Sequence, residues 1–378
     1  MKNPFEVGCY YFPNYHVDPR NEAVHGPGWS EWELVKAATP RFPGHRQPKV
    51  PLAGCEMEND PAVMARKIDL AADHGIDFFI FDWYYYDDGP YLERALEEGF
   101  FNAPNRDRLR FCCMWANHDW INIHPCGRKF GRELLYPGSV TPETFRKMTR
   151  YLVERYFSHP SHYQVEGCPY FSIYDLNRFL RGFGSLAAAR AALDEFRALT
   201  QSAGFPGLHL NLVVWNRAVL PGEENLPDMP ELIRQLGFDS TTSYVWIHHV
   251  GLNQSPGVDY DLVREGYFGH WDRMTREYAV PYFPNVTMGW DSSPRTIQSE
   301  SWFPVTGYPN MNLILDNTPE KFRAALAQTR ARLEQGSGPR ILNINCWNEW
   351  TEGSYLEPDR EHGLAYLQAV KAVFGSRA

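Results

Sequence analysis

Short apolar runs alternate with longer amphipathic stretches along the whole chain. Eight of the runs have the length and the β-branched and aromatic content of buried strands. They cover residues 5–12, 77–83, 109–115, 169–174, 208–214, 241–246, 282–287 and 340–346. Most of them are apolar until their last residues and then turn polar. Continuous apolar strands of this kind are typical of a parallel sheet whose two faces are covered.

A helical pattern follows each strand. Several helices begin at clear capping signals, among them Asp60-Pro61, Thr141-Pro142, Ser185 and Thr318-Pro319. We predict helices over residues 61–74, 90–99, 142–157, 185–204, 260–278, 319–336 and 361–373, with a short one near residue 230. Residues 13–58, after the first strand, form a long irregular loop, and such a loop in a compact domain is usually functional.

Eight strand–helix repeats favour an α/β fold of the (β/α)8 TIM-barrel type. The competing architecture is a doubly wound open sheet, but neither G-x-G-x-x-G nor a P-loop follows the first strand. No Gly-, Ser- or Pro-rich linker divides the chain. We therefore predict one catalytic domain over residues 1–378, with a long first βα loop.

The amino-acid composition excludes some classes of function but does not identify one. Of 378 residues, 43% are hydrophobic and 22% charged, as in a folded globular protein, and the net charge is −9. No basic stripe is present, so a nucleic acid is not expected as a partner.

Residues 1–6 do not begin a secretory signal and no run could span a bilayer, so we expect a cytoplasmic protein unless a signal was trimmed. The seven cysteines lack C-x-x-C spacing, and we expect neither a metal nor another cofactor.

Aromatic residues supply 15% of the chain, and many stand beside polar residues at the ends of the predicted strands. In a barrel these ends converge on one face. A bowl of rings, amides, imidazoles and carboxyls suits a sugar, which has an apolar C–H face and a rim of hydroxyls. The predicted substrate-binding residues are Tyr11, His16, Glu31, Trp83, Asn117, Trp120, Trp215, Trp246, His248 and Asn348.

The last strand leads into the most distinctive stretch, residues 341–353, which contains Asn348, Glu349 and Glu352. The two glutamates would point to opposite faces of a continuing strand, so they share a site only if the chain turns after Asn348. Retaining glycosidases use two close carboxyls, one of which keeps its proton at neutral pH. Burial beside Trp347 and Trp350 would raise a carboxyl pKa in that way. Each glutamate alone could instead form a salt bridge or cap a helix.

Several motifs together resemble the WbsX-like branch of proteins with a glycoside hydrolase family 99-like domain. They are Tyr10-Tyr11-Phe12-Pro13-Asn14-Tyr15-His16, Gly28-Trp29-Ser30-Glu31-Trp32, Gly44-His45-Arg46-Gln47-Pro48, Met114-Trp115-Ala116-Asn117, Trp347-Asn348-Glu349-Trp350-Thr351-Glu352-Gly353 and Tyr355-Leu356-Glu357-Pro358. The resemblance covers nearly the whole chain. It implies a (β/α)8 barrel and relation to retaining endo-α-mannosidases.

The same resemblance implies roles for the two glutamates. Glu349 would act as the base on the sugar 2-hydroxyl, giving a 1,2-anhydro intermediate, and Glu352 would act as the acid/base. Thr351 stands where the mannosidases tend to have histidine, so mannose specificity transfers only weakly. Glu31, between two tryptophans of the long loop, would bind substrate.

We therefore predict a glycoside hydrolase that cleaves an α-linked glycan with retention, its substrate an oligosaccharide or a mannose- or rhamnose-containing polysaccharide. One alternative is a glycosyltransferase of surface-polysaccharide synthesis. Its usual metal-binding Asp-x-Asp is matched only by residues 259–261, at a predicted helix start where aspartates are good caps. The other alternative is a carbohydrate-binding barrel without catalysis. The sequence does not indicate an oligomeric state.

Overall fold

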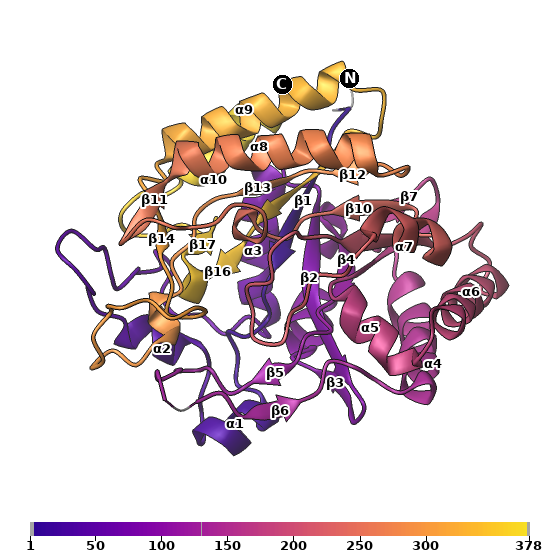
Figure 1. Cartoon of the computed structure of the whole chain (residues 1–378), viewed down its shortest axis with the longest axis horizontal. Coiled ribbons are helices and arrows are strands. Elements are labelled where there is room, and N and C mark those ends of the chain that lie inside the picture. Colours follow the sequence, from indigo (N-terminus) through magenta and orange to yellow (C-terminus); the bar gives the residue numbers. More distant parts are fainter. Residues whose placement is uncertain (1–3, 130, 376–378) are drawn as a thin grey trace.

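A computed structural model describes residues 4–129 and 131–375 (Figure 1). A parallel sheet forms its centre, with the order β12-β10-β9-β8-β4-β2-β1-β15-β13. The strands in chain order are β1 (Glu6–Tyr11), β2 (Phe78–Tyr86), β4 (Arg110–Trp115), β8 (Cys168–Ile173), β9 (His209–Val213), β10 (Ser240–Thr242), β12 (Tyr282–Phe283), β13 (Asn285–Thr287) and β15 (Ile341–Asn345). The predicted domain reaches residues 1–3, 130 and 376–378, which lie outside the described part of the chain.

The sheet closes into a barrel through one interrupted strand. β12 pairs with β10 and β13 pairs with β15, both in parallel. Only Pro284 separates β12 from β13, and proline cannot donate to the ladder. Counted together, these two short strands are the predicted seventh strand, over residues 282–287. The predicted TIM-barrel fold is confirmed.

Helices cover the outside of the barrel (Figure 1). They are α3 (Pro61–Asp73), α4 (Pro142–Tyr151), α5 (Leu176–Phe183), α6 (Leu186–Ser202), α7 (Met229–Leu236), α8 (Tyr260–Glu277), α9 (Pro319–Gln335) and α10 (Ala365–Phe374). Asp60, Thr141, Ser185 and Thr318 cap their helices as predicted, each accepting a backbone N–H of the first turn.

Several elements differ from the sequence-based prediction. The helix predicted over 142–157 is α-helical only to Tyr151 and ends as a π-helix (Leu152–Phe157), and two short helices interrupt the loop predicted over 13–58. Residues 90–99 form the end of β3 (Gly89–Tyr91) and most of a π-helix (Ala95–Phe100) rather than one α-helix. The strand predicted over 241–246 ends at Thr242, and its last residue begins a 3-10 turn (Trp246–His248). α5 was not predicted. Asp175 is its N-cap, a structural role that an aspartate at the end of a strand can take instead of a functional one.

Long loops cover the carboxyl ends of the barrel strands. The first contains α1 (Pro19–His25) and α2 (Trp32–Ala37), and α2 lies beside the loop between β13 and α9. The remaining short strands are β5 (Trp120–Ile121), β6 (Leu134–Tyr136), β7 (Gln164–Val165), β11 (Gly257–Asp259), β14 (Leu313–Leu315), β16 (Asn348–Glu349) and β17 (Ser354–Tyr355). No helix in the described ranges combines the length and the hydropathy that crossing a membrane requires.

Candidate active site

The chain turns sharply after Asn348. β16 and β17 form a small antiparallel pair, and a 3-10 turn (Trp350–Glu352) joins them. Gly353 follows with φ +64°, where a Cβ would lie 2.7 Å from that of Asp291. Only glycine fits this left-handed, crowded position. The turn puts Glu349 and Glu352 on the same side of the chain, as the site hypothesis requires.

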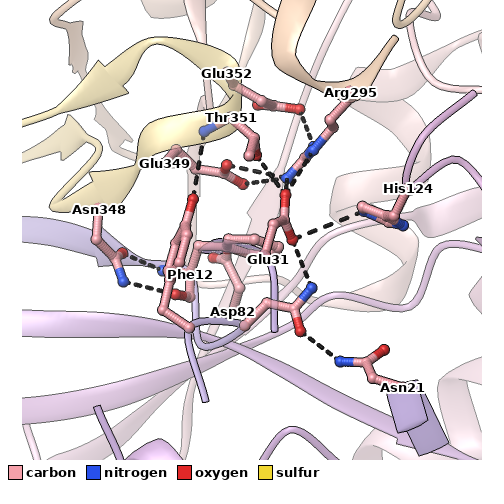
Figure 2. Close-up of polar contacts among 12 residues, drawn as sticks. Phe12, Asn21, Glu31, Asp82, His124, Arg295, Asn348, Glu349, Thr351 and Glu352 are labelled. Carbon is pink, nitrogen blue, oxygen red and sulfur yellow. Dashed lines mark hydrogen bonds and ion pairs between the residues drawn. The ribbon is translucent and has the colours of Figure 1, made fainter. Parts of the chain in front are cut away.

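One arginine holds three buried carboxyls (Figure 2). Arg295 Nη1 lies 2.6 Å from Glu352 Oε1, and Nη2 lies 3.1 Å from Glu349 Oε2. The same Nη2 lies 2.8 Å from Glu31 Oε1, and Nε donates to that oxygen at 2.9 Å. The guanidinium also lies over the Phe12 ring, 5.2 Å from its centroid. A planar fork of five N–H donors makes such a three-way contact feasible, which a lysine could not reproduce.

The three carboxyls differ in how many hydrogen bonds they accept from donors other than Arg295. Glu31 accepts hydrogen bonds from Thr351 Oγ1 and, at 2.5 Å, from Asn14 Nδ2. Glu352 accepts one from Tyr308 Oη at 2.7 Å. Arg295 is the donor recorded for the Glu349 side chain among the described residues. Glu349 is therefore held less tightly than the other two.

The electrostatics follow these contacts. Burial raises the pKa of Glu349 well above its usual value, and the negative charge of Glu352 adds to this effect while Arg295 opposes it. Burial also raises the pKa of Glu352, against Arg295 and the Tyr308 hydrogen bond. For Glu31, burial is outweighed by Arg295, His124 and Thr351, so its pKa falls below the usual value. The site therefore contains one firmly ionised carboxylate and two carboxyls able to hold a proton.

A cavity opens beside Glu349 and Glu352. Its enclosed volume is about 70 Å³, and about 640 Å³ is counted when the space open to solvent at its mouth is included. Most of its wall is apolar or aromatic. Besides the two glutamates, its lining includes Phe12, Asp82, Tyr84, Met114, Ala116, His118, Trp120, His124, Tyr174, Tyr244, Arg295 and Tyr308.

The predicted site residues fall into separate groups. Three of them line the cavity, namely Glu349, Glu352 and Trp120. Glu31 is linked to the two glutamates through Arg295. Trp120 stacks on His124, with ring centroids 5.4 Å apart.

Three predicted substrate ligands instead surround Glu58, which is fully buried. Tyr11 Oη donates to Glu58 at 2.9 Å, and His16 Nδ1 lies 3.2 Å from it. The Asn348 amide pairs with the backbone N–H and carbonyl of Phe12 and donates to Glu58 at 3.3 Å. These contacts fasten the first loop to the glutamate-bearing turn.

Two predicted tryptophans pack on the outside of the barrel wall. Trp83 donates to Tyr156 Oη at 3.1 Å because alternation along β2 turns it away from the cavity that Asp82 and Tyr84 line. Trp246 donates to the Asn285 carbonyl at 3.0 Å.

The last three lie behind the cavity lining. Asn117 pairs with the backbone of Asp175. His248 lies 3.5 Å from Glu223, which accepts a hydrogen bond from Tyr174. The Trp215 ring lies 5.1 Å from that of Tyr174.

Sequence reasoning missed Arg295 and Tyr308. Both lie in the loop between β13 and α9, far from any strand end, and neither belongs to a motif singled out above. The Ser293–Arg295 3-10 turn carries the arginine. The remaining signal was charge balance, because three buried carboxyls in one place require a cation.

Glu357 anchors the glutamate-bearing turn from behind. Its two carboxylate oxygens accept the indole N–H groups of Trp347 at 3.0 Å and Trp350 at 2.7 Å, and Lys67 lies 2.8 Å away.

We expect Glu357→Gln to lower the free energy of unfolding by about 1–3 kcal/mol, because the new amide NH₂ would face an indole N–H that then lacks an acceptor. Urea titration measures this loss. Glu361→Gln is the matched control, since Glu361 pairs with Arg46 and Lys49 nearer the surface and should change stability by less than about 1 kcal/mol. Equal effects of the two substitutions would contradict the anchoring role.

Fold and site together define a (β/α)8-barrel protein with a buried arginine–carboxyl cluster beside a cavity. The chain belongs to the family described as Glycosyltransferase WbsX, whose model matches residues 7–370. It is 28% identical over 384 residues to the uncharacterized protein WxcX of Xanthomonas campestris pv. campestris (strain B100). That match covers 97% of this chain and 49% of the relative, so the chain spans about half the length of the curated relatives it matches.

Several solved structures of similar fold are glycoside hydrolases or resemble them. The GH99 endo-alpha-mannosidase from Bacteroides thetaiotaomicron has a TM-score of 0.58 at 16% identity, over 97% of this chain and 96% of that one. A glycoside hydrolase-like protein has a TM-score of 0.62 at 14% identity, over 100% and 95%. The family 1 β-glucosidase from Thermotoga maritima has a TM-score of 0.51 at 11% identity, over 100% and 99%. At these identities the likeness establishes the barrel fold.

Proposed function

We propose that this protein is a glycoside hydrolase that cleaves an α-linked glycan, such as a mannose- or rhamnose-containing polysaccharide, with retention. The observation that carries the proposal is the Glu349–Glu352 pair, held by one guanidinium at the wall of an aromatic-lined cavity. Both carboxyls contact one guanidinium, so they lie within reach of the same bound sugar, and glycosidases act with two carboxyls that flank the glycosidic bond.

The family 99 resemblance suggests a division of labour between the two glutamates. Burial raises the pKa of Glu349, so it is a stronger base than an ordinary carboxylate once ionised, and it would take the proton of the sugar 2-hydroxyl. That oxygen attacks the anomeric carbon as the glycosidic bond breaks, giving a 1,2-anhydro sugar. Glu352 protonates the leaving oxygen and then removes a proton from the water that opens the epoxide, while Glu349 returns its proton to the sugar 2-oxygen. Arg295 and Tyr308 stabilise Glu352 whenever it is ionised.

The description of the family favours a glycosyltransferase as the second candidate. A nucleotide-sugar donor brings a diphosphate, which needs cations. Among the described cavity-lining residues the cationic candidates are Arg295, His118 and His124. Burial lowers the pKa of both histidines, that of His124 to about 3, and Arg295 already contacts three carboxyls. This charge balance supports the hydrolase.

Incubation with α-linked manno- and rhamno-oligosaccharides and bacterial polysaccharides tests the proposal, with products followed by NMR. The hydrolase predicts release of an initially α-configured sugar by the wild type and not by Glu349→Gln. Transfer from added nucleotide sugars, without hydrolysis, would establish the glycosyltransferase instead. Sugar binding that Glu349→Gln leaves unchanged, without any turnover, would establish a binding barrel.

A further inference from the structure

Two further carboxyls line the cavity without taking part in the Arg295 cluster: Asp119 is paired with Arg178, whereas Asp82 has no cation partner among the described residues. Asp82 belongs to β2 and pairs in register with Met114 of β4, which also lines the cavity. Its side chain is 2% exposed. Tyr244 Oη donates to Asp82 Oδ2 at 2.8 Å, whereas Oδ1 has no hydrogen-bond partner among the described residues. A buried polar atom in a cavity wall that the protein leaves unpaired is free to bond a water or a ligand in the cavity.

The surroundings of Asp82 disfavour its negative charge. Burial raises its pKa well above the usual value, the charge of Glu352 adds to the effect, and the Tyr244 hydrogen bond and Arg295 oppose it. The ionisable groups that interact with Asp82 are Cys9, Tyr10, Tyr84, Tyr244, Arg295, Cys346, Glu349 and Glu352. Arg295 is the one cation of this set, and it is already held by three other carboxyls.

Because Oδ2 accepts from Tyr244, a proton on Asp82 belongs on Oδ1, where it makes a donor toward a bound molecule. We propose that Asp82, as a neutral carboxylic acid, donates a hydrogen bond to a hydroxyl oxygen of an uncharged sugar in the cavity. This inference rests on the proposed function and narrows its substrate. An anionic sugar such as a uronate would face the carboxyls of Glu349 and Glu352, and the one arginine beside them is already shared with Glu31, so neutral sugars are favoured.

Infrared spectroscopy tests the protonation of Asp82 without any ligand. The difference spectrum of wild type minus Asp82→Asn at neutral pH should contain the C=O band of a protonated carboxyl. Carboxylate bands alone in that spectrum would overturn the inference. Asp291→Asn is a matched control, because Asp291 is also buried outside the described cavity lining, but its contacts with His45 and Gln47 outweigh burial and lower its pKa, so its difference spectrum should contain carboxylate bands.

Ligand-observed NMR titration tests the contact itself, with methyl α-D-mannoside, methyl α-L-rhamnoside and D-mannuronate as probes. We expect Asp82→Asn to bind the neutral glycosides within about threefold of wild type, because its Nδ2 replaces the donor. Asp82→Leu should bind at least about tenfold more weakly, and mannuronate at least about tenfold more weakly than the mannoside. Tyr244→Phe, which keeps the carboxyl, should lie between the two Asp82 variants.

Wild-type affinity in Asp82→Leu, preference for the uronate, or failure of the wild type to bind either neutral glycoside would overturn the inference. Circular dichroism melts confirm that each variant is folded. The binding and infrared results do not depend on turnover. Absence of hydrolysis with the expected binding pattern would therefore refute the proposed function and leave the Asp82 contact standing.

Discussion

Arg295→Gln should both unfold the protein more easily and abolish most of its activity. The wild-type guanidinium contacts Glu31, Glu349 and Glu352, all fully or almost fully buried. Removing the cation leaves their charges without compensation, and breaking a buried ion pair in this way costs about 3–5 kcal/mol. We also expect kcat/KM to fall by about 10²-fold or more, because the catalytic pair loses its alignment.

The loss of stability in Arg295→Gln should depend on pH. Without the arginine, each carboxyl has a pKa in the folded variant above its value in the unfolded chain, which is about 4.3 for glutamate. A group whose pKa is raised by folding stabilises below its unfolded pKa, and this contribution is lost as the pH rises through the folded pKa. The wild-type Glu31, whose pKa is lowered, behaves in the opposite way and loses its contribution as the pH falls. The difference in melting temperature between variant and wild type should therefore shrink in acid.

Melting curves between pH 4.5 and 8 measure this dependence. The matched control is Arg190→Gln, because Arg190 forms an exposed pair with Asp194 on α6. Exposed pairs of this kind contribute about 0.3–0.5 kcal/mol. Arg295→Gln variants that melt like Arg190→Gln, or whose deficit grows in acid, would show that the three carboxyls do not depend on the guanidinium.

The barrel could be predicted because its signals are local and repeated. The apolar runs and the caps Asp60, Thr141, Ser185 and Thr318 were visible in the sequence, and each of the eight predicted runs overlaps a strand. The errors arose at short elements. The end of the strand predicted over 241–246 became a 3-10 turn that buries Trp246 under α8, because packing overrode its β propensity. No local pattern indicated that residues 90–99 would contain a π-helix.

The candidate site could be predicted only in part from the sequence, for geometric reasons. Strand-end position identifies which residues are near the cavity but not which way they point. Asp82, Trp83 and Tyr84 are consecutive, yet the first and third line the cavity while Trp83 packs against Tyr156. Arg295 reaches the site from a loop 54 residues before Glu349, and nothing local to it indicates that contact. Long-range ion pairs are visible only once the chain is folded.

Glu352→Gln and Glu349→Gln should respond differently to the leaving group of the substrate. If Glu352 protonates the leaving oxygen, its amide variant loses about 10²–10⁴-fold on unactivated glycosides, the usual contribution of a general acid. The phenolate leaving group of an activated aryl glycoside departs without protonation. For these substrates the bond-breaking step should therefore proceed in the same variant at close to the wild-type rate. Glu349→Gln lacks the base that activates the 2-hydroxyl, and it should lose activity on both kinds of substrate.

Initial rates on aryl α-glycosides whose phenols span a range of acidity, beside an oligosaccharide substrate, separate these cases. Glu361→Gln serves as the control, because Glu361 lies outside the described lining of the Glu349–Glu352 cavity. Equal losses on all substrates would remove Glu352 from the acid role. Selective rescue of Glu349→Gln by good leaving groups would assign the acid to Glu349, a reversal that its weaker hold on Arg295 and its strongly raised pKa would then explain. Tyr308 and Arg295 would in that case keep Glu352 ionised throughout the reaction.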